Sequence, residues 1–141
     1  MDSIQRDFDN IIKAIQQEDS RYDKAAYVFL RQALDYTLNE LSKSQKNLLS
    51  RHISGKELLE GIRCFALREY GPMSFYLLRS WGINSCEDFG NIVFNLVESE
   101  VLGKTDEDSP KDFENGYEFK DAFIDPFEPS GRINLKTPRL Y

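Results

Sequence analysis

Apolar residues recur at α-helical spacing in five successive segments, and this pattern predicts a mainly helical fold. The first apolar stripe consists of Ile4, Phe8, Ile11, Ile12 and Ile15. Further helices are expected at about residues 23–42, 54–70, 73–81 and 85–102. A chain of 141 residues has the length of one domain. We therefore predict a mainly α fold with a single helical domain over residues 1–124.

Capping residues indicate where several of these helices begin and end. Ser54 and Glu57 have the spacing of a capping box, in which each side chain satisfies a free backbone N–H. Gly71-Pro72 is expected to end the same helix, because proline disfavours helical geometry in the residue before it. Ser85 is expected to cap the last helix, with Asp88 at its positive end.

The stretch from Trp81 to Pro110 indicates a more specific architecture. The expected helix 73–81, the turn 82–84 and the helix after Ser85 have the spacing of a helix-turn-helix. The aromatic residues Tyr117, Phe119 and Phe123 alternate too briefly to define a strand. We therefore expect two N-terminal helices packed against a C-terminal helix-turn-helix or winged-helix-like unit. A short β-hairpin around residues 103–123 would form its wing.

Charge argues against DNA reading by that unit. The net charge of −6 is uneven: residues 84–129 hold 13 acidic and 3 basic residues. The expected recognition helix offers only acids and asparagines, where DNA-reading helices usually bring arginine or lysine as well. An acidic surface repels the phosphates that supply most nucleic-acid affinity. Recognition of a basic protein partner fits this charge better.

Residues 125–141 are expected to form an extended tail. Pro126, Pro129, Gly131 and Pro138 disfavour regular structure in this segment. The last twelve residues carry three basic side chains and no acidic one. The tail also keeps the apolar residues Phe127, Ile133, Leu135, Leu140 and Tyr141. Such a composition suggests docking on the chain's own domain, on a second copy or on a partner.

The motifs of several enzyme and metalloprotein classes are missing from the sequence. It contains one histidine and two isolated cysteines, and it lacks Cys-x-x-Cys, His-Glu-x-x-His, Walker-type and Gly-x-Ser-x-Gly motifs. We therefore predict no catalytic residue, cofactor or metal site. No apolar run approaches the ~20 residues of a membrane span. The acidic N-terminus is unlike a signal peptide, so a cytoplasmic location is expected.

The favoured hypothesis is a non-enzymatic protein-interaction or regulatory module of unknown pathway. A protein partner is expected, with assembly into a homo-oligomer as a second option and no membrane association. The predicted contact residues are Asp88, Asn91, Asn95, Glu98, Arg132, Lys136, Arg139 and Tyr141.

Two alternatives belong to other functional classes. The first is nucleic-acid or ribonucleoprotein binding of the helix-turn-helix type, through basic residues outside the acidic region. The interior basic cluster consists of Lys43, Lys46, Arg51, His52 and Lys56. The second, less favoured, is an enzyme that uses carboxylates in an interhelical pocket. Such carboxylates need apolar surroundings that raise one pKa.

Three segments together resemble a known protein family. They are RYDKAAYVFLRQALDYTL, ISGKELLEGIR and WGINSCEDFGNIVFNLVESEVLGKTDEDSPKDF. The combination resembles a small uncharacterised bacterial family, the planctomycete–verrucomicrobial conserved hypothetical proteins, over about residues 4–123. The resemblance implies a bacterial cytosolic protein that forms one unit. It brings no activity, cofactor or catalytic residue.

Overall fold

A computed structural model describes residues 2–44, 53–99, 113–114 and 116–128 of the chain. Its α-helices are α1 Asp2–Glu18, α2 Lys24–Ser44, α3 Gly55–Tyr70, α4 Ser74–Ser80 and α5 Cys86–Glu98. Shorter helical turns are η2 Gly71–Met73, η4 Lys120–Ile124 and η5 Asp125–Phe127. The described residues contain these helices and no strand, which confirms the prediction of a mainly helical fold.

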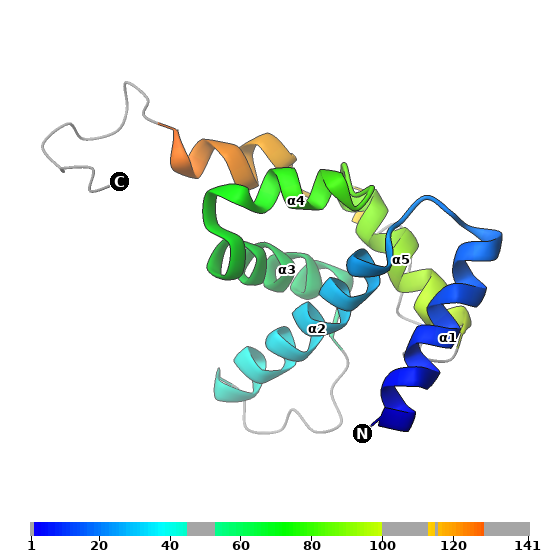
Figure 1. The fold of residues 1–141 in the computed structure, drawn as a ribbon. Coiled ribbons are helices and arrows are strands. Elements are labelled where there is room, and N and C mark those ends of the chain that lie inside the picture. Colours follow the sequence, from blue (N-terminus) through cyan, green and yellow to red (C-terminus); the bar gives the residue numbers. More distant parts are fainter. Residues whose placement is uncertain (1, 45–52, 100–112, 115, 129–141) are drawn as a thin grey trace, which may run out of the picture.

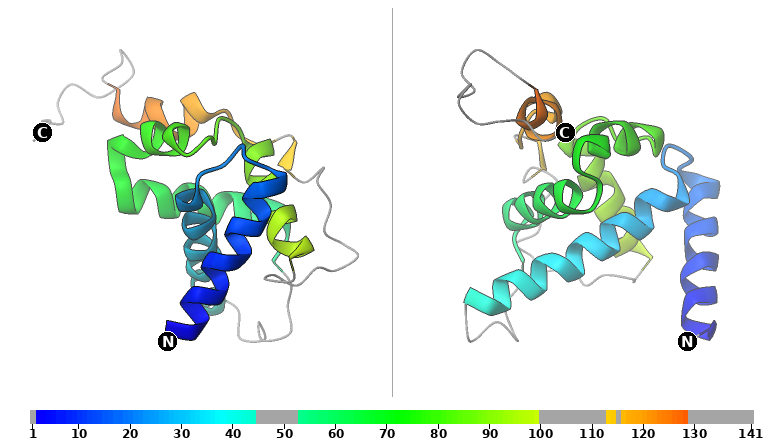
Figure 2. Two further views of the ribbon diagram at one scale, coloured as in Figure 1. Left: turned by 45° about the vertical axis from the view of Figure 1, so that its right-hand side comes forward. Right: turned by 60° about the vertical axis from the view of Figure 1, so that its left-hand side comes forward.

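Helix α2 lies at the centre of the arrangement. It packs most extensively against α3 and also contacts α5 and α1. Helix α4 folds back beside α3, and η4 packs against both α3 and α4 (Figure 1). Helix α1 and η5 lie at opposite ends of the molecule (Figures 1 and 2). The described helices therefore surround α2 on several sides.

The expected helix limits are largely confirmed. The Ser54 hydroxyl accepts from the Glu57 N–H at 3.1 Å, and the Glu57 carboxylate accepts from the Ser54 N–H at 3.0 Å. Gly71 ends α3 with a φ of +51°, which suits glycine. The Asp88 carboxylate accepts from the Ser85 N–H at 3.2 Å at the start of α5. Helix α5 ends at Glu98, four residues earlier than its apolar pattern predicted.

The hydrophobic core contains residues of the first predicted apolar stripe, whereas one apolar position of α2 is exposed. Phe8, Ile12 and Ile15 are buried, as the first apolar stripe predicted. On α2, the apolar spacing predicts Leu38 on the buried face, but this side chain is 38% exposed. The other buried apolar residues are Tyr22, Ala26, Tyr27, Phe29, Leu30, Ala33, Leu58, Leu59, Ile62, Ala66, Leu78, Ile83, Cys86, Phe89, Ile92, Leu96, Phe113, Phe119, Ala122 and Phe123.

The aromatic segment near the C-terminal end of the described chain forms helical turns from Phe119 onward, and its described residues contain no strand. Phe119 and Phe123 lie four residues apart and pack together with a ring separation of 5.0 Å. Phe119 also contacts Phe89 of α5 at 5.5 Å. This i, i+4 spacing buries both rings in a helical turn, whereas a strand would leave them 13 Å apart by its rise of about 3.3 Å per residue. The hairpin is not confirmed, and its residues 103–112 lie outside the described ranges.

The prolines at the start of the expected tail do not prevent a further helical turn. Residues 125–127 form η5, where regular structure was not expected. Pro126 lies in the first turn, where a missing backbone N–H costs no internal hydrogen bond. The rest of the expected tail, residues 129–141, lies outside the described ranges.

Among the described helices, none is long and apolar enough to cross a bilayer.

Helices α2 and α3 approach each other closely at Gly61. A Cβ atom at this position would lie 1.8 Å from Oγ1 of Thr37, which is buried and donates to the Ala33 carbonyl at 2.7 Å. The absence of a side chain at Gly61 thus allows the largest helix–helix contact in the fold.

We expect Gly61→Ala to destabilise the protein by about 1–3 kcal/mol, because the added methyl group overpacks this crossing. Urea unfolding measures the loss. The double variant Thr37→Ala with Gly61→Ala removes the clashing hydroxyl and should recover part of the stability. Equal stability of Gly61→Ala and the unaltered chain would contradict the close crossing.

Candidate interaction surfaces

The turn between α1 and α2 is attached to α5 by a network around Tyr22. The Tyr22 hydroxyl donates to the Asp88 carboxylate at 2.5 Å, and Asn91 donates to the Tyr22 oxygen at 2.9 Å. Tyr22 is 1% exposed. Its burial, together with the neighbouring Asp88 carboxylate, raises the pKa of the Tyr22 hydroxyl above its usual value. We call Tyr22, Asp88 and Asn91 the tyrosine network.

A second set of contacts lies one turn further along α5. Asn95 donates to the Asp19 carboxylate and to the Tyr27 hydroxyl, each at 3.0 Å. Arg21 binds Asp19 through two hydrogen bonds of 2.8 and 2.7 Å. Hydrogen bonds from Arg21 and then Asn95 outweigh the opposing effect of burial and hold the pKa of Asp19 well below its usual range. The guanidinium also lies 5.1 Å from the ring centre of Tyr22.

These contacts assign an internal role to three predicted partner residues. Asp88, Asn91 and Asn95 lie on one side of α5, and their side chains form hydrogen bonds with the α1–α2 turn, the start of α2 and the cap of α5. The structure brings them together as the helical spacing implied, but it does not leave them as a free polar face. The side of α5 on which a DNA-reading helix would carry its polar groups is thus directed into the fold.

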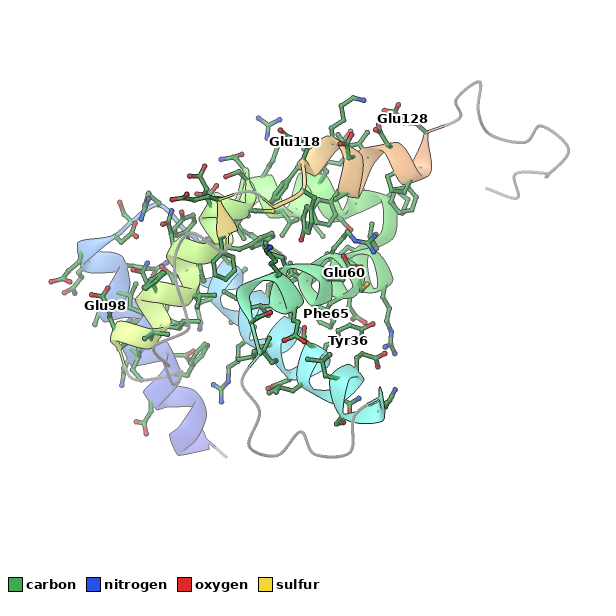
Figure 3. All side chains as sticks on the ribbon, turned by 180° about the vertical axis from the view of Figure 1, so that it is seen from behind. Tyr36, Glu60, Phe65, Glu98, Glu118 and Glu128 are labelled. Carbon is green, nitrogen blue, oxygen red and sulfur yellow. The ribbon has the colours of Figure 1, made fainter. Side chains whose placement is uncertain are left out.

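Glu98 remains exposed at the end of α5 (Figure 3). Together with Asn95 it lines a hollow of about 520 Å³, whose other acidic residues are Glu18 and Asp19. Helices α1 and α5 both end at this hollow, and helix C-termini carry partial negative charge. The hollow is therefore electronegative, although Asp19 is already paired with Arg21.

The other predicted contact residues are not brought together by the described structure. Arg132, Lys136, Arg139 and Tyr141 lie outside the described ranges, as do Lys46, Arg51 and His52. Lys43 pairs with Glu40 within α2 at 3.0 Å, and Lys56 is exposed in the first turn of α3.

The pKa shifts of a buried thiol and of two carboxylates bear on the alternative of an enzyme. Burial raises the pKa of the Cys86 thiol to about 11, so the thiol stays protonated at neutral pH. Arg63 lowers the pKa of Glu60, as Arg21 does for Asp19, whereas a general acid needs a raised pKa. Thr37 and Ser74 are the buried polar residues of the described ranges, which also hold no group of three potential metal ligands.

A shallow groove that the sequence did not single out lies between α2 and the end of α3. It has a volume of about 360 Å³ and is lined by Asp23, Lys24, Ala25, Val28, Phe29, Gln32, Tyr70 and Trp81, which we call the aromatic groove. The Trp81 ring lies 5.7 Å from the Phe29 ring and 5.9 Å from the Tyr70 ring. Phe29 is buried beneath, while Tyr70 and Trp81 are half-buried.

One signal in the sequence could have revealed this groove. Ala25, Val28, Phe29 and Gln32 follow the i, i+3, i+4, i+7 spacing of one helix side, adjacent to the predicted buried face. A helix that is apolar on more than one side must cover the second side with another part of the chain or with a partner. Tyr70 and Trp81, which complete the groove, are distant in sequence from these α2 residues, so only the tertiary structure shows that they contribute to it.

The aromatic groove continues as a row of rings along α2. Phe65 lies 5.7 Å from Phe29, and Tyr36 lies 5.5 Å from Phe65. Figure 3 shows Tyr36 and Phe65 where α2 meets α3. The Arg68 guanidinium lies 5.7 Å from the Tyr36 ring centre. Half-buried rings thus extend well beyond the groove itself.

No family model matches this chain, and no curated protein sequence or solved structure shows significant similarity to it. The resemblance to a bacterial family therefore stays a prediction.

The tyrosine network should contribute strongly to stability. We expect Tyr22→Phe to lower the free energy of unfolding by about 1–3 kcal/mol, because Asp88 loses a donor and Asn91 loses an acceptor in a water-poor site. Urea unfolding measures the loss. Tyr76→Phe is the matched control, since Tyr76 is 60% exposed and should change stability by less than about 0.5 kcal/mol. Similar values for the two variants would contradict the role of the network.

Stability in acid should depend on Asp19. Its folded pKa lies below the unfolded value of about 3.9, so its contribution is present above about pH 4 and is lost as the pH falls. We expect Asp19→Asn to be less stable at neutral pH and to lose less further stability on acidification. Urea unfolding at a series of pH values compares the two chains. Parallel profiles below about pH 4 would contradict this assignment.

Proposed function

We propose that the protein is a non-enzymatic protein-interaction or regulatory module, and that a segment of its partner binds in the aromatic groove. The observation that carries this proposal is the half-exposed pair Tyr70 and Trp81 above the buried Phe29. Tyrosine and tryptophan are enriched among the residues that dominate protein interfaces. Covering these rings would remove apolar surface from water at little cost in side-chain entropy.

The lining of the aromatic groove favours an extended apolar segment as the ligand. Neither the Tyr70 hydroxyl nor the Trp81 indole N–H has a hydrogen-bond partner in the described part of the chain. Such groups usually find acceptors when they become buried. The backbone carbonyls of an extended or polyproline-type segment are suitable acceptors, because they make no internal hydrogen bonds. Asp23 and Lys24 supply polar groups at the rim.

The alternative of nucleic-acid binding by a helix-turn-helix has weaker support. Helix α4, the turn at Gly82 and α5 are the elements from which a helix-turn-helix or winged-helix-like unit would be built. The polar side of α5, however, contacts the α1–α2 turn through the tyrosine network. The pKa values of Asp19 and Glu60 likewise give little support to an enzyme with interhelical carboxylates. A cytoplasmic location and a bacterial origin remain parts of the proposal.

Peptide selection tests whether the aromatic groove binds protein segments. A random peptide library displayed on phage is selected against the immobilised full chain. We expect enrichment of extended apolar or proline-containing peptides, and we expect Val28→Glu to abolish their binding because it places a charge on the apolar wall. Binding of synthetic versions is measured by fluorescence polarisation.

The matched control for Val28→Glu is Asn39→Glu, which adds the same charge to an exposed position of α2 outside the groove. Thermal unfolding by circular dichroism verifies that both variants fold. Peptides that bind Val28→Glu as well as Asn39→Glu would place the interaction elsewhere. A library that yields no binding peptide would overturn the proposal.

A further inference from the structure

The chain itself contains a segment with the chemistry that suits the aromatic groove. Residues 129–141 include Pro129 and Pro138, and they contain no acidic side chain. Their apolar residues are Ile133, Leu135, Leu140 and Tyr141. We propose that this segment occupies the aromatic groove of its own molecule and competes there with partner segments. The inference rests on the proposed function, because it names an internal ligand for the same groove.

The position of η5 makes this occupancy geometrically accessible. The segment follows Glu128, directly after η5, and η4 packs against both α3 and α4. Figures 1 and 2 show η5 beside the corner where α3 leads into α4. Tyr70, at the end of α3, belongs both to this corner and to the aromatic groove. Thirteen residues reach at most about 45 Å, whereas the seven residues of α4 span only about 10 Å.

Two large apolar side chains are exposed near this corner. Met73 and Tyr76 are 55% and 60% exposed, the highest values among the large apolar residues of the described ranges. They belong to η2 and α4, which connect Tyr70 to Trp81 along the chain, and α4 packs against η4. A segment that leaves η5 and reaches the aromatic groove would therefore cross apolar surface and cover part of it, a favourable change in water.

Backbone chemistry and charge both favour this ligand. Prolines disfavour helix formation, so carbonyl groups near them are available to accept hydrogen bonds from Tyr70 and Trp81. The segment carries Arg132, Lys136 and Arg139, whereas residues 1–128 contain 15 basic and 24 acidic residues. The net charge is thus +3 for residues 129–141 and −9 for residues 1–128, and these opposite charges attract the segment to its own domain.

The single tryptophan of the chain, Trp81, lies in the aromatic groove and reports on its occupancy. Acrylamide quenching of its fluorescence is compared between the full chain and a full-length variant with Leu135→Ser, Leu140→Ser and Tyr141→Ser. If the segment covers Trp81, this variant shows stronger quenching and an emission maximum at longer wavelength. The control variant carries Ser130→Ala, Asn134→Ala and Thr137→Ala, and it should match the unaltered chain.

Equal quenching in the unaltered chain and the serine variant would overturn the inference. A protection of Trp81 that grows with protein concentration, together with a doubled mass in light scattering, would also overturn it, because the segment would then bind a second copy. Phage-selected peptides should bind the serine variant more tightly than the unaltered chain. If the peptides bind both chains equally and Val28→Glu still abolishes their binding, the proposed function stands and the internal ligand is rejected.

Discussion

The hydrogen bond between Tyr22 and Asp88 connects the α1–α2 turn to the first turn of α5, so it holds together two segments that are distant in the sequence. Tyr22 lies in the α1–α2 turn, and Asp88 is the residue that also caps α5. The connection is reinforced at Gly82, where a Cβ atom would lie 2.2 Å from the Arg21 carbonyl oxygen. With a φ of +93°, this position suits glycine alone. The α1–α2 turn and the turn between α4 and α5 therefore approach each other through backbone atoms and one buried hydroxyl.

The same connection also shapes the aromatic groove. The Asp23 N–H donates to the Trp81 carbonyl at 3.1 Å, which attaches the start of α2 to the end of α4. This bond holds Trp81 beside Phe29, and the half-exposed indole becomes one wall of the groove. The groove thus arises from a structural connection that uses the polar side of α5. The aromatic groove and the inward-directed polar side of α5 therefore both depend on contacts of the α1–α2 turn.

Local chemistry explains which parts of the fold and of the site were predictable. The capping box of Ser54 acts within four residues, so its helix start was recognisable. The alternation after Tyr117 was too short to separate a strand from a helical turn, and the partner ring of Phe89 decided between them. Asn95 was correctly placed beside other polar groups of α5, yet its partners Asp19 and Tyr27 are distant in sequence.

The sequence by itself determined the helices, because helical periodicity and caps act over only a few residues. It also determined the charge imbalance between residues 84–129 and the end of the chain. Tertiary structure alone decided which side of each helix is exposed, since that depends on neighbours far apart in the chain. It therefore turned Asp88 and Asn91 into internal contacts and gathered Phe29, Tyr70 and Trp81 into a groove.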